Sequence, residues 1–124
     1  MKKELRERVW SKYKKHCAYC GCDLTYKQLR IDHIKAKYRG DTDESLIKLC
    51  RKRGSDDESN LNPSCGSCNS SKGCMSIESF RTAIMYKLTA IRRDSSQFRL
   101  LERYEIVKAV KDKVVFYFEK ERSK

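Results

Sequence analysis

The sequence predicts a small α+β protein in which a bound metal ion supplements a thin apolar core. Three observations predict this class. Two Cys-x-x-Cys pairs, at 17–20 and 65–68, enclose a short segment of the chain. A run with strand-like alternation, at 29–34, lies inside that segment. Apolar residues recur at helical spacing on both sides of the segment.

The bulk composition agrees with one small, strongly basic domain. The chain has 124 residues, of which 37% are charged and 39% hydrophobic, so its core benefits from a metal staple. The net charge of +12 favours a polyanionic partner such as nucleic acid, with a merely soluble basic surface as the alternative. No apolar run of about 18 residues and no signal peptide are visible, so we expect a cytoplasmic protein without a membrane span.

The seven cysteines indicate metal binding, because disulfides are rare in a reducing cytoplasm. A Cys-x-x-Cys turn aims two thiolates at one ion, and two such turns complete a tetrahedral zinc site. We therefore predict a structural zinc ion at Cys17, Cys20, Cys65 and Cys68. Cys22 is the main rival ligand and His16 a weaker one. Four sulfur ligands leave no open position, so this zinc is not expected to catalyse a reaction. Cys50 and Cys74 are expected in the core.

The N-terminal half is predicted to form a helix followed by a strand. Residues 3–15 place apolar side chains on one face and basic ones on the other, which is typical of an amphipathic helix. Residues 29–34 alternate and contain β-branched side chains, which favours a strand. The polar segment 35–59 is long for a loop in a small domain unless it is functional, and residues 45–52 are expected to form a helical turn in it.

The second half is predicted to contain a short strand, three helices and a final strand. Residues 60–64 can pair with 29–34, and a helix then runs from Cys68 to a cap at Gly73. Ser76 is predicted to cap a longer helix, and Ser95 or Ser96 the next one. Residues 113–119 alternate between apolar positions, which predicts a strand or hairpin at the C-terminal end.

Asp32, His33 and Asn69 carry the most specific chemistry in the sequence. Asp32 and Asn69 offer hard oxygen ligands for an ion such as Mg²⁺, and strand pairing would bring them together. An imidazole, with an unperturbed pKa near ~6.5, can accept a proton from water. A lone histidine on a strand is more often structural, but this set suits phosphodiester hydrolysis. Lys72 is predicted to bind a flanking phosphate, or else to be an exposed lysine at a helix end.

The order Cys-x-x-Cys, Asp-His, Asn-Leu and Cys-x-x-Cys-Asn-x-x-Lys-Gly resembles the HNH endonuclease family over residues 16–73. The zinc-stapled form found in phages and prokaryotes is the most similar. The resemblance implies a ββα-metal fold, a prokaryotic or phage-infected cell, and Mg²⁺ or Mn²⁺ as catalytic ion. It implies four catalytic positions, namely the general base His33, the metal ligands Asp32 and Asn69, and Asn60, which braces the loop and orients the histidine. Asn62 is a rival for Asn60.

The sequence departs from the family pattern in the segment between His33 and Asn60. A Gly-Gly pair often follows the Asp-His strand, whereas only Arg39-Gly40 stands here, and the segment is longer than usual. Substrate contact by this insertion is left open. Its basic residues are expected to contact nucleic acid together with Lys72, namely Lys35, Lys37 and Arg39.

The sequence therefore predicts a single HNH nuclease domain over 1–124, with its core at 16–73 and an extension at 75–124. The expected function is metal-dependent hydrolysis of DNA. The alternatives are an inactive zinc-stapled nucleic-acid-binding module and a zinc protein that binds proteins, which the charge of +12 disfavours. The sequence leaves open whether one or both strands are cut and whether a homodimer or a protein partner is needed for specificity.

Overall fold

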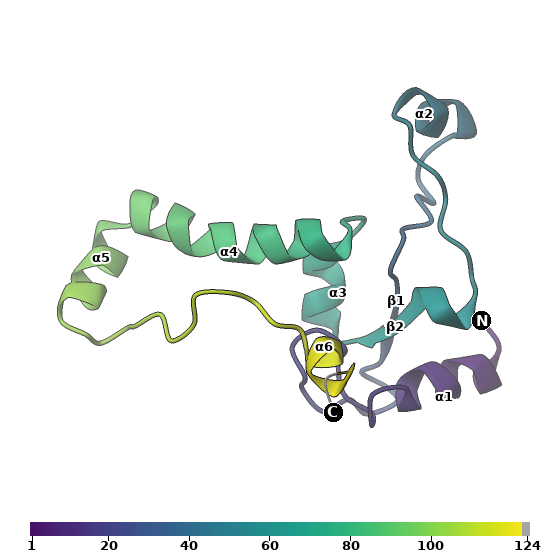
Figure 1. Ribbon diagram of the computed structural model, residues 1–124, viewed down its shortest axis with the longest axis horizontal. Helices are drawn as coiled ribbons and strands as arrows, with labels where there is room; N and C mark the ends of the chain where they lie inside the picture. The colour runs from purple at the N-terminus through teal and green to yellow at the C-terminus, as the bar shows by residue number, and fades with distance from the viewer. Residues whose placement is uncertain (123–124) are drawn as a thin grey trace. The chain divides into compact units, whose positions relative to one another are not determined.

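The computed structural model describes residues 1–122. Along them the elements follow in the order α1 Lys3–Ser11, β1 Arg30–His33, α2 Asp43–Lys48, the 3₁₀ turn η1 Glu58–Asn60, β2 Leu61–Ser64, α3 Gly66–Lys72, α4 Ile77–Asp94, α5 Ser96–Arg103 and α6 Tyr117–Arg122 (Figure 1). The predicted α+β class is confirmed. The last two residues of the predicted extension, 123 and 124, lie outside the described part.

The strands β1 and β2 form an antiparallel pair, as the sequence predicted. Arg30 lies opposite Ser64, and His33 lies opposite Leu61. α3 follows β2 directly and packs against β1, which completes a ββα unit. The pairing therefore brings the start of α3 close to the strand that carries Asp32 and His33.

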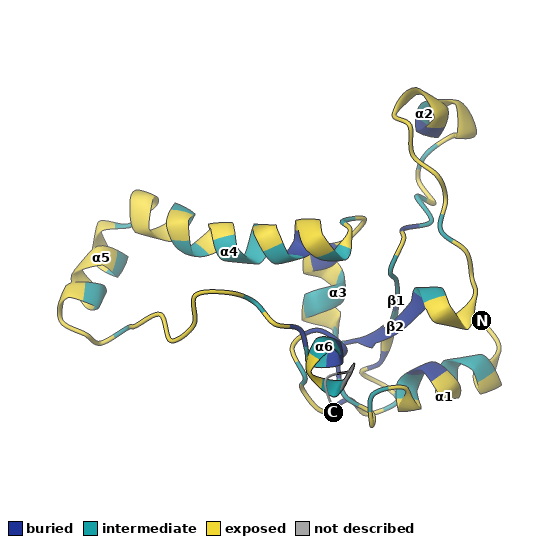
Figure 2. Cartoon of the chain, in the orientation of Figure 1, coloured by how far each residue is buried: buried dark blue, intermediate teal, exposed yellow. Residues whose placement is uncertain are grey.

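The core lies around this ββα unit. Figure 2 shows buried residues gathered along both strands and the segments beside them. All four residues of β2 are buried, and Val9 and Leu29 are fully enclosed. Tyr19 makes edge contacts with Phe116 and Phe118 at ring distances of 5.4 Å and 6.1 Å. The C-terminal segment therefore contributes aromatic side chains to a core that α1 and the strands begin.

The strand predicted at 113–119 is wrong, because α6 begins at Tyr117. The carboxylate of Glu119 accepts a hydrogen bond of 2.9 Å from the Phe116 backbone N–H, a contact that stabilises the start of a helix. The alternation in the sequence reflects burial of Phe116 and Phe118 and not a ladder. Only Tyr117 and Phe118 donate backbone hydrogen bonds from this segment to the chain around Tyr19, at 3.0 Å and 2.8 Å.

The chain divides into two compact units. The first holds residues 1–76 and the segment from Phe116 onward, and the second holds 77–115. The predicted extension is thus shared between both units. In the second unit, Ser95 caps α5 by accepting a hydrogen bond from Phe98 N–H, as predicted. No helix within residues 1–122 has both the length and the apolar character needed to cross a bilayer.

The segment between His33 and Asn60 forms an arm, defined here as residues 35–57. Its two sides run together from the strands to α2 at the tip (Figure 1). The Arg53 guanidinium holds the sides together by donating to the carbonyls of Lys37, Tyr38 and Asp41. Nearer the strands, Gly54 N–H donates to Ala36 O at 2.8 Å. The insertion is therefore an arm whose short helix, α2, overlaps the predicted range of 45–52 but begins and ends earlier, at Asp43 and Lys48.

Candidate active site and zinc site

The four predicted zinc ligands gather at one point. The sulfur atoms of Cys17, Cys20, Cys65 and Cys68 all lie within 4.8 Å of one another. Cys20 Sγ and Cys65 Sγ are 3.8 Å apart. Zinc–sulfur bonds of about 2.3 Å place two sulfurs of a tetrahedron roughly 3.8 Å apart, so the cluster fits a zinc ion. Neither rival is one of the four clustered residues: the thiol of Cys22 contacts that of Cys20 beside the cluster, and His16 Nε2 pairs with Asp23 Oδ1 at 2.9 Å.

Local geometry places these thiols. Cys17 N–H donates to Cys22 O at 2.8 Å and Gly21 N–H donates to Cys17 O at 3.0 Å, which closes the first turn. Cys65 precedes α3 and caps it, because its sulfur accepts a hydrogen bond from Cys68 N–H. The hydrogen bond between Cys17 and Cys68 lowers the pKa of Cys17 and raises the pKa of Cys68, so these two thiols share one proton. Metal binding here would fasten α3 to the turn after α1.

Three predicted catalytic residues border one pocket of about 380 Å³. Asp32 and His33 reach it from β1, and Asn69 reaches it from α3. Arg39 and Lys37 line it from the arm. The strand pairing and the cysteine cluster position the two walls of this pocket. The structure thus brings together the imidazole, the carboxylate and the amide that the sequence singled out.

Asp32 is almost fully buried, with 3% of its surface exposed. One carboxylate oxygen accepts a hydrogen bond from the Tyr19 hydroxyl, and Lys72 Nζ lies 3.2 Å from both oxygens. Burial raises the pKa of Asp32, while Tyr19 and Lys72 act in the opposite direction. Burial, followed by the Asp32 charge, raises the pKa of Tyr19 well above its usual range. Tyr19 is a site residue that the sequence did not indicate.

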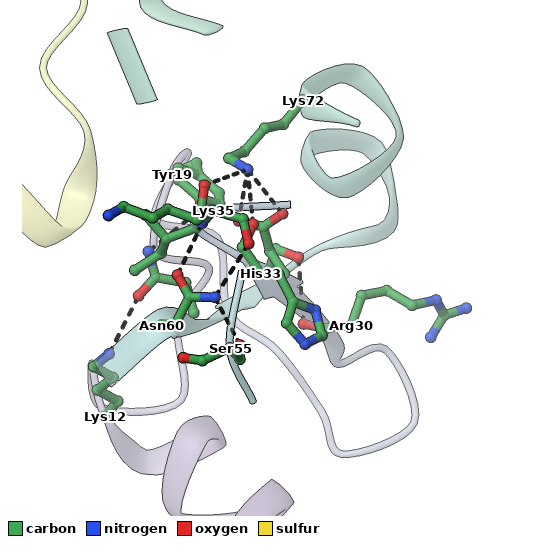
Figure 3. A network of polar contacts seen from close by, with 12 residues as sticks. Lys12, Tyr19, Arg30, His33, Lys35, Ser55, Asn60 and Lys72 are labelled. Atoms are coloured by element: carbon green, nitrogen blue, oxygen red, sulfur yellow. Dashed lines mark hydrogen bonds and ion pairs between the residues drawn. The ribbon is translucent and has the colours of Figure 1, made fainter. Parts of the chain in front are cut away.

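Lys72 does not occupy a position from which it can bind a flanking phosphate. Its side chain is fully buried, and its ammonium donates to Asp32 and to the carbonyls of His33 and Ile34. Figure 3 shows it extending from α3 toward the strand that carries His33. The predicted phosphate contact and the alternative of an exposed lysine are therefore both wrong. The helical turn between Asn69 and Lys72 directs the ammonium inward, where Asp32 compensates its charge.

His33 contacts a residue that the sequence did not single out. Its Nε2 lies 2.9 Å from Asp56 Oδ1, on the far side of the arm. Lys37 Nζ donates to Asp56 Oδ2 at 2.7 Å, so one carboxylate joins the two side chains. The hydrogen bond from Lys37 and then that from His33 lower the pKa of Asp56 to about 2. Because 23 residues separate Asp56 from His33, only the fold of the arm could reveal the contact.

Asn60 clamps both sides of the arm at its base (Figure 3). Its Oδ1 accepts a hydrogen bond of 2.8 Å from Lys35 N–H, and its Nδ2 donates to Lys35 O and Ser55 O. This geometry agrees with the bracing role that the resemblance implied for Asn60. The rival Asn62 is buried in the core, where its amide donates to the Tyr19 hydroxyl at 3.3 Å.

The basic residues near the pocket differ in their surroundings. Lys35 and Arg39 are exposed, whereas Lys37 is held by Asp56. Arg6 on α1 donates to Leu29 O, and Lys12, which directly follows α1, donates to Leu61 O, so these cations fasten the helix to the core. Cys50 and Cys74, expected in the core, are exposed. Lys35 and Arg39 are therefore the predicted cations that remain open to a phosphate at this site.

Comparison with known proteins identifies the segment that carries the site. Residues 17–74 match the family model described as HNH endonuclease. No curated protein and no solved structure gives a significant match to the chain. The matched segment contains the cysteine cluster, the ββα unit and the pocket. Residues 17–74, which carry the candidate site, therefore match the HNH endonuclease family.

Proposed function

We propose that this protein is a divalent-metal-dependent DNA endonuclease that hydrolyses phosphodiester bonds at the pocket between β1 and α3. One observation carries the proposal: His33, Asp32 and Asn69 border the same pocket within the segment that matches the family. A general base beside two hard oxygen ligands is the arrangement that metal-assisted hydrolysis requires.

The residues fit a catalytic ion. Asp32 and Asn69 offer a carboxylate oxygen and an amide oxygen, which are ligands that Mg²⁺ and Mn²⁺ prefer. Each carboxylate oxygen accepts more than one contact, so the bonds from Tyr19 and Lys72 do not exhaust Asp32. Two protein ligands agree with the tendency of Mg²⁺ to keep several waters. When bound, such an ion polarises the phosphate and stabilises the leaving 3′ oxygen.

His33 supplies the general base. Its neutral imidazole accepts a proton from the attacking water at the pocket. Arg39 lines the pocket and Lys35 lies next to its lining residue Ala36 in the sequence; both are exposed and hold the DNA backbone there. Contacts of this kind give affinity that depends on salt and carry little sequence information. A structural zinc ion on the four cysteines keeps α3 in place against the strands.

Cleavage of supercoiled plasmid tests the proposal. We expect wild type to produce nicked or linear DNA only when Mg²⁺ or Mn²⁺ is added, and His33→Ala to bind DNA without cutting it. Metal dependence is tested by adding the ions to protein prepared without them, because a chelator would also remove zinc. Glu7→Ala is the control, since Glu7 is exposed on α1, away from the pocket residues.

The outcomes separate the two functional classes. Equal cutting by wild type and His33→Ala contradicts the assigned base. If wild type slows DNA in a gel yet never cuts it with either ion, the protein is instead an inactive zinc-stapled nucleic-acid-binding module. If wild type does cut the plasmid, the ratio of nicked to linear product indicates whether one copy of the protein acts alone.

A further inference from the structure

The carboxylate of Asp56 joins His33 and Lys37 across the two sides of the arm. Its Oδ1 lies 2.9 Å from His33 Nε2, and its Oδ2 accepts a hydrogen bond of 2.7 Å from Lys37 Nζ. The His33 side chain is 12% exposed, whereas that of Asp56 is 60% exposed. Asp56 thus reaches a largely enclosed imidazole from the solvent side. Each of its oxygens has its own partner.

This contact determines which nitrogen of His33 carries the proton. Lys37 and His33 together keep the pKa of Asp56 at about 2, so its carboxylate is ionised at neutral pH. An ionised carboxylate only accepts hydrogen bonds, so neutral His33 must donate from Nε2 and keep the lone pair on Nδ1. Nδ1 has no hydrogen-bond partner among the described residues, and the ring borders the pocket.

The base of the arm holds Asp56 in this register. Asn60 donates to the carbonyl of Ser55, the residue before Asp56, at 2.8 Å. The same amide pairs with the backbone of Lys35, which lies two residues after His33. Gly54 adds a backbone hydrogen bond to Ala36 O at 2.8 Å. The segment that carries Asp56 is therefore fixed against the segment that follows His33.

We propose that Asp56 is a positioning residue that holds His33 as the Nε2–H tautomer and leaves Nδ1 to accept the proton of the attacking water. The proposal rests on the endonuclease function proposed above. Lys37 keeps the Asp56 carboxylate in place and is not itself a DNA contact in this arrangement. Asn60 holds the backbone of Ser55, and Ser55 precedes Asp56, which contacts His33. Asn60 therefore influences the position of the histidine through this segment.

The tautomer can be measured without any cleavage assay. The chain has two histidines, so a long-range ¹H–¹⁵N spectrum resolves both rings, with His16 as an internal reference. At about pH 8.5 an ordinary imidazole is neutral and its two nitrogens have distinct shifts. We expect His33 of the wild type to be the Nε2–H tautomer. In Asp56→Ala we expect a mixture of both tautomers, with backbone amide shifts away from the arm unchanged.

Single-turnover cleavage and DNA affinity are then measured on the same variants. We expect Asp56→Ala to cut about 10- to 100-fold more slowly at unchanged affinity, as is typical when a residue that orients a site residue is lost. Asp56→Glu keeps an acceptor on an exposed segment, so it should recover part of the rate. Asp57→Ala is the matched control, because that neighbouring carboxylate is exposed and makes no capping hydrogen bond to η1.

The results separate this proposal from the proposed function. A wild-type Nδ1–H tautomer, or an unchanged tautomer in Asp56→Ala, overturns the positioning role whether or not DNA is cut. Cleavage by Asp56→Ala at the wild-type rate also overturns it. A loss that Asp57→Ala shares points to general disturbance of the arm and equally overturns it. If wild type cuts no DNA, the endonuclease function fails, while the spectra still test the contact between Asp56 and His33.

Discussion

Lys72 and Asp32 form a buried ion pair, and Asp32 borders the pocket. Their side chains are 0% and 4% exposed, and Lys72 Nζ lies 3.2 Å from the carboxylate. The ammonium also donates to the carbonyls of His33 and Ile34, so its hydrogen-bonding capacity is used within the fold. Charges removed from water in this way are tolerated only when paired. Lys72 therefore holds Asp32 in place within the fold, and loss of the ion pair should change the free energy of unfolding.

Lys72→Met should strongly destabilise the protein. The substitution leaves the buried Asp32 carboxylate without its partner, which costs about 3–5 kcal/mol in the free energy of unfolding. Urea unfolding with zinc in excess measures the change. The double variant Asp32→Asn/Lys72→Met removes both charges and should recover much of the loss. Wild-type stability of the single variant would contradict the buried pair.

The cysteine cluster should bind one zinc ion per chain and depend on it for folding. Cys65→Ser removes one ligand and the sulfur that caps α3, so the protein should lose zinc and unfold. Zinc content and circular dichroism measure both effects. Cys50→Ser is the matched control, because Cys50 is exposed on the arm and lies outside the cluster. A folded, zinc-free Cys65→Ser protein would exclude a structural zinc.

The stability of the protein should fall at alkaline pH because of Tyr19. Burial raises its pKa above the ordinary value of 10.0, so the folded state holds the phenol proton more tightly than the unfolded chain. The stabilisation is complete below pH 10.0 and declines as the pH rises above that value, where only the unfolded chain ionises.

Absorbance at alkaline pH checks this expectation. One of the seven tyrosines should stay un-ionised until the protein unfolds. Tyr19→Phe should weaken the dependence of the unfolding free energy on pH in this range, although it also removes the hydrogen bond to Asp32. Ionisation of all seven tyrosines in the folded protein would show that Tyr19 is not enclosed.

Features set by nearby residues were predictable from the sequence, and features set by distant contacts were not. The cysteine spacing and the alternation around Asp32 are local patterns, and from them the cysteine cluster and the strand pairing were predicted. Nothing local indicates that Lys72 is buried, because its partner is 40 residues away. The contact of Asp56 with His33 likewise depends on the arm. At the C-terminal end, the spacing of the buried residues Phe116 and Phe118 resembled the alternation of a strand. The segment instead begins a helix, where the Glu119 carboxylate accepts a hydrogen bond from Phe116 N–H.

Gly54→Ala should disturb the base of the arm and, through it, His33. A Cβ at Gly54 would lie 1.8 Å from Lys35 O and 2.9 Å from Asn60 Nδ2, so the two sides of the arm must separate. We expect a loss of about 1–3 kcal/mol in stability, as for other overpacked positions.

Amide hydrogen exchange and thermal unfolding test the role of Gly54. Exchange of the Gly54 and Lys35 amides should accelerate in Gly54→Ala, because their acceptors are Ala36 O and Asn60 Oδ1. Gly40→Ala is the matched control on the same arm, since a Cβ there meets no atom within 4 Å. If both variants keep wild-type exchange and melting temperature, the sides of the arm are not held by the close approach at Gly54. If amide exchange accelerates in Gly54→Ala and not in Gly40→Ala, the close contact at Gly54 is needed for the hydrogen bonds by which Asn60 holds the two sides of the arm together.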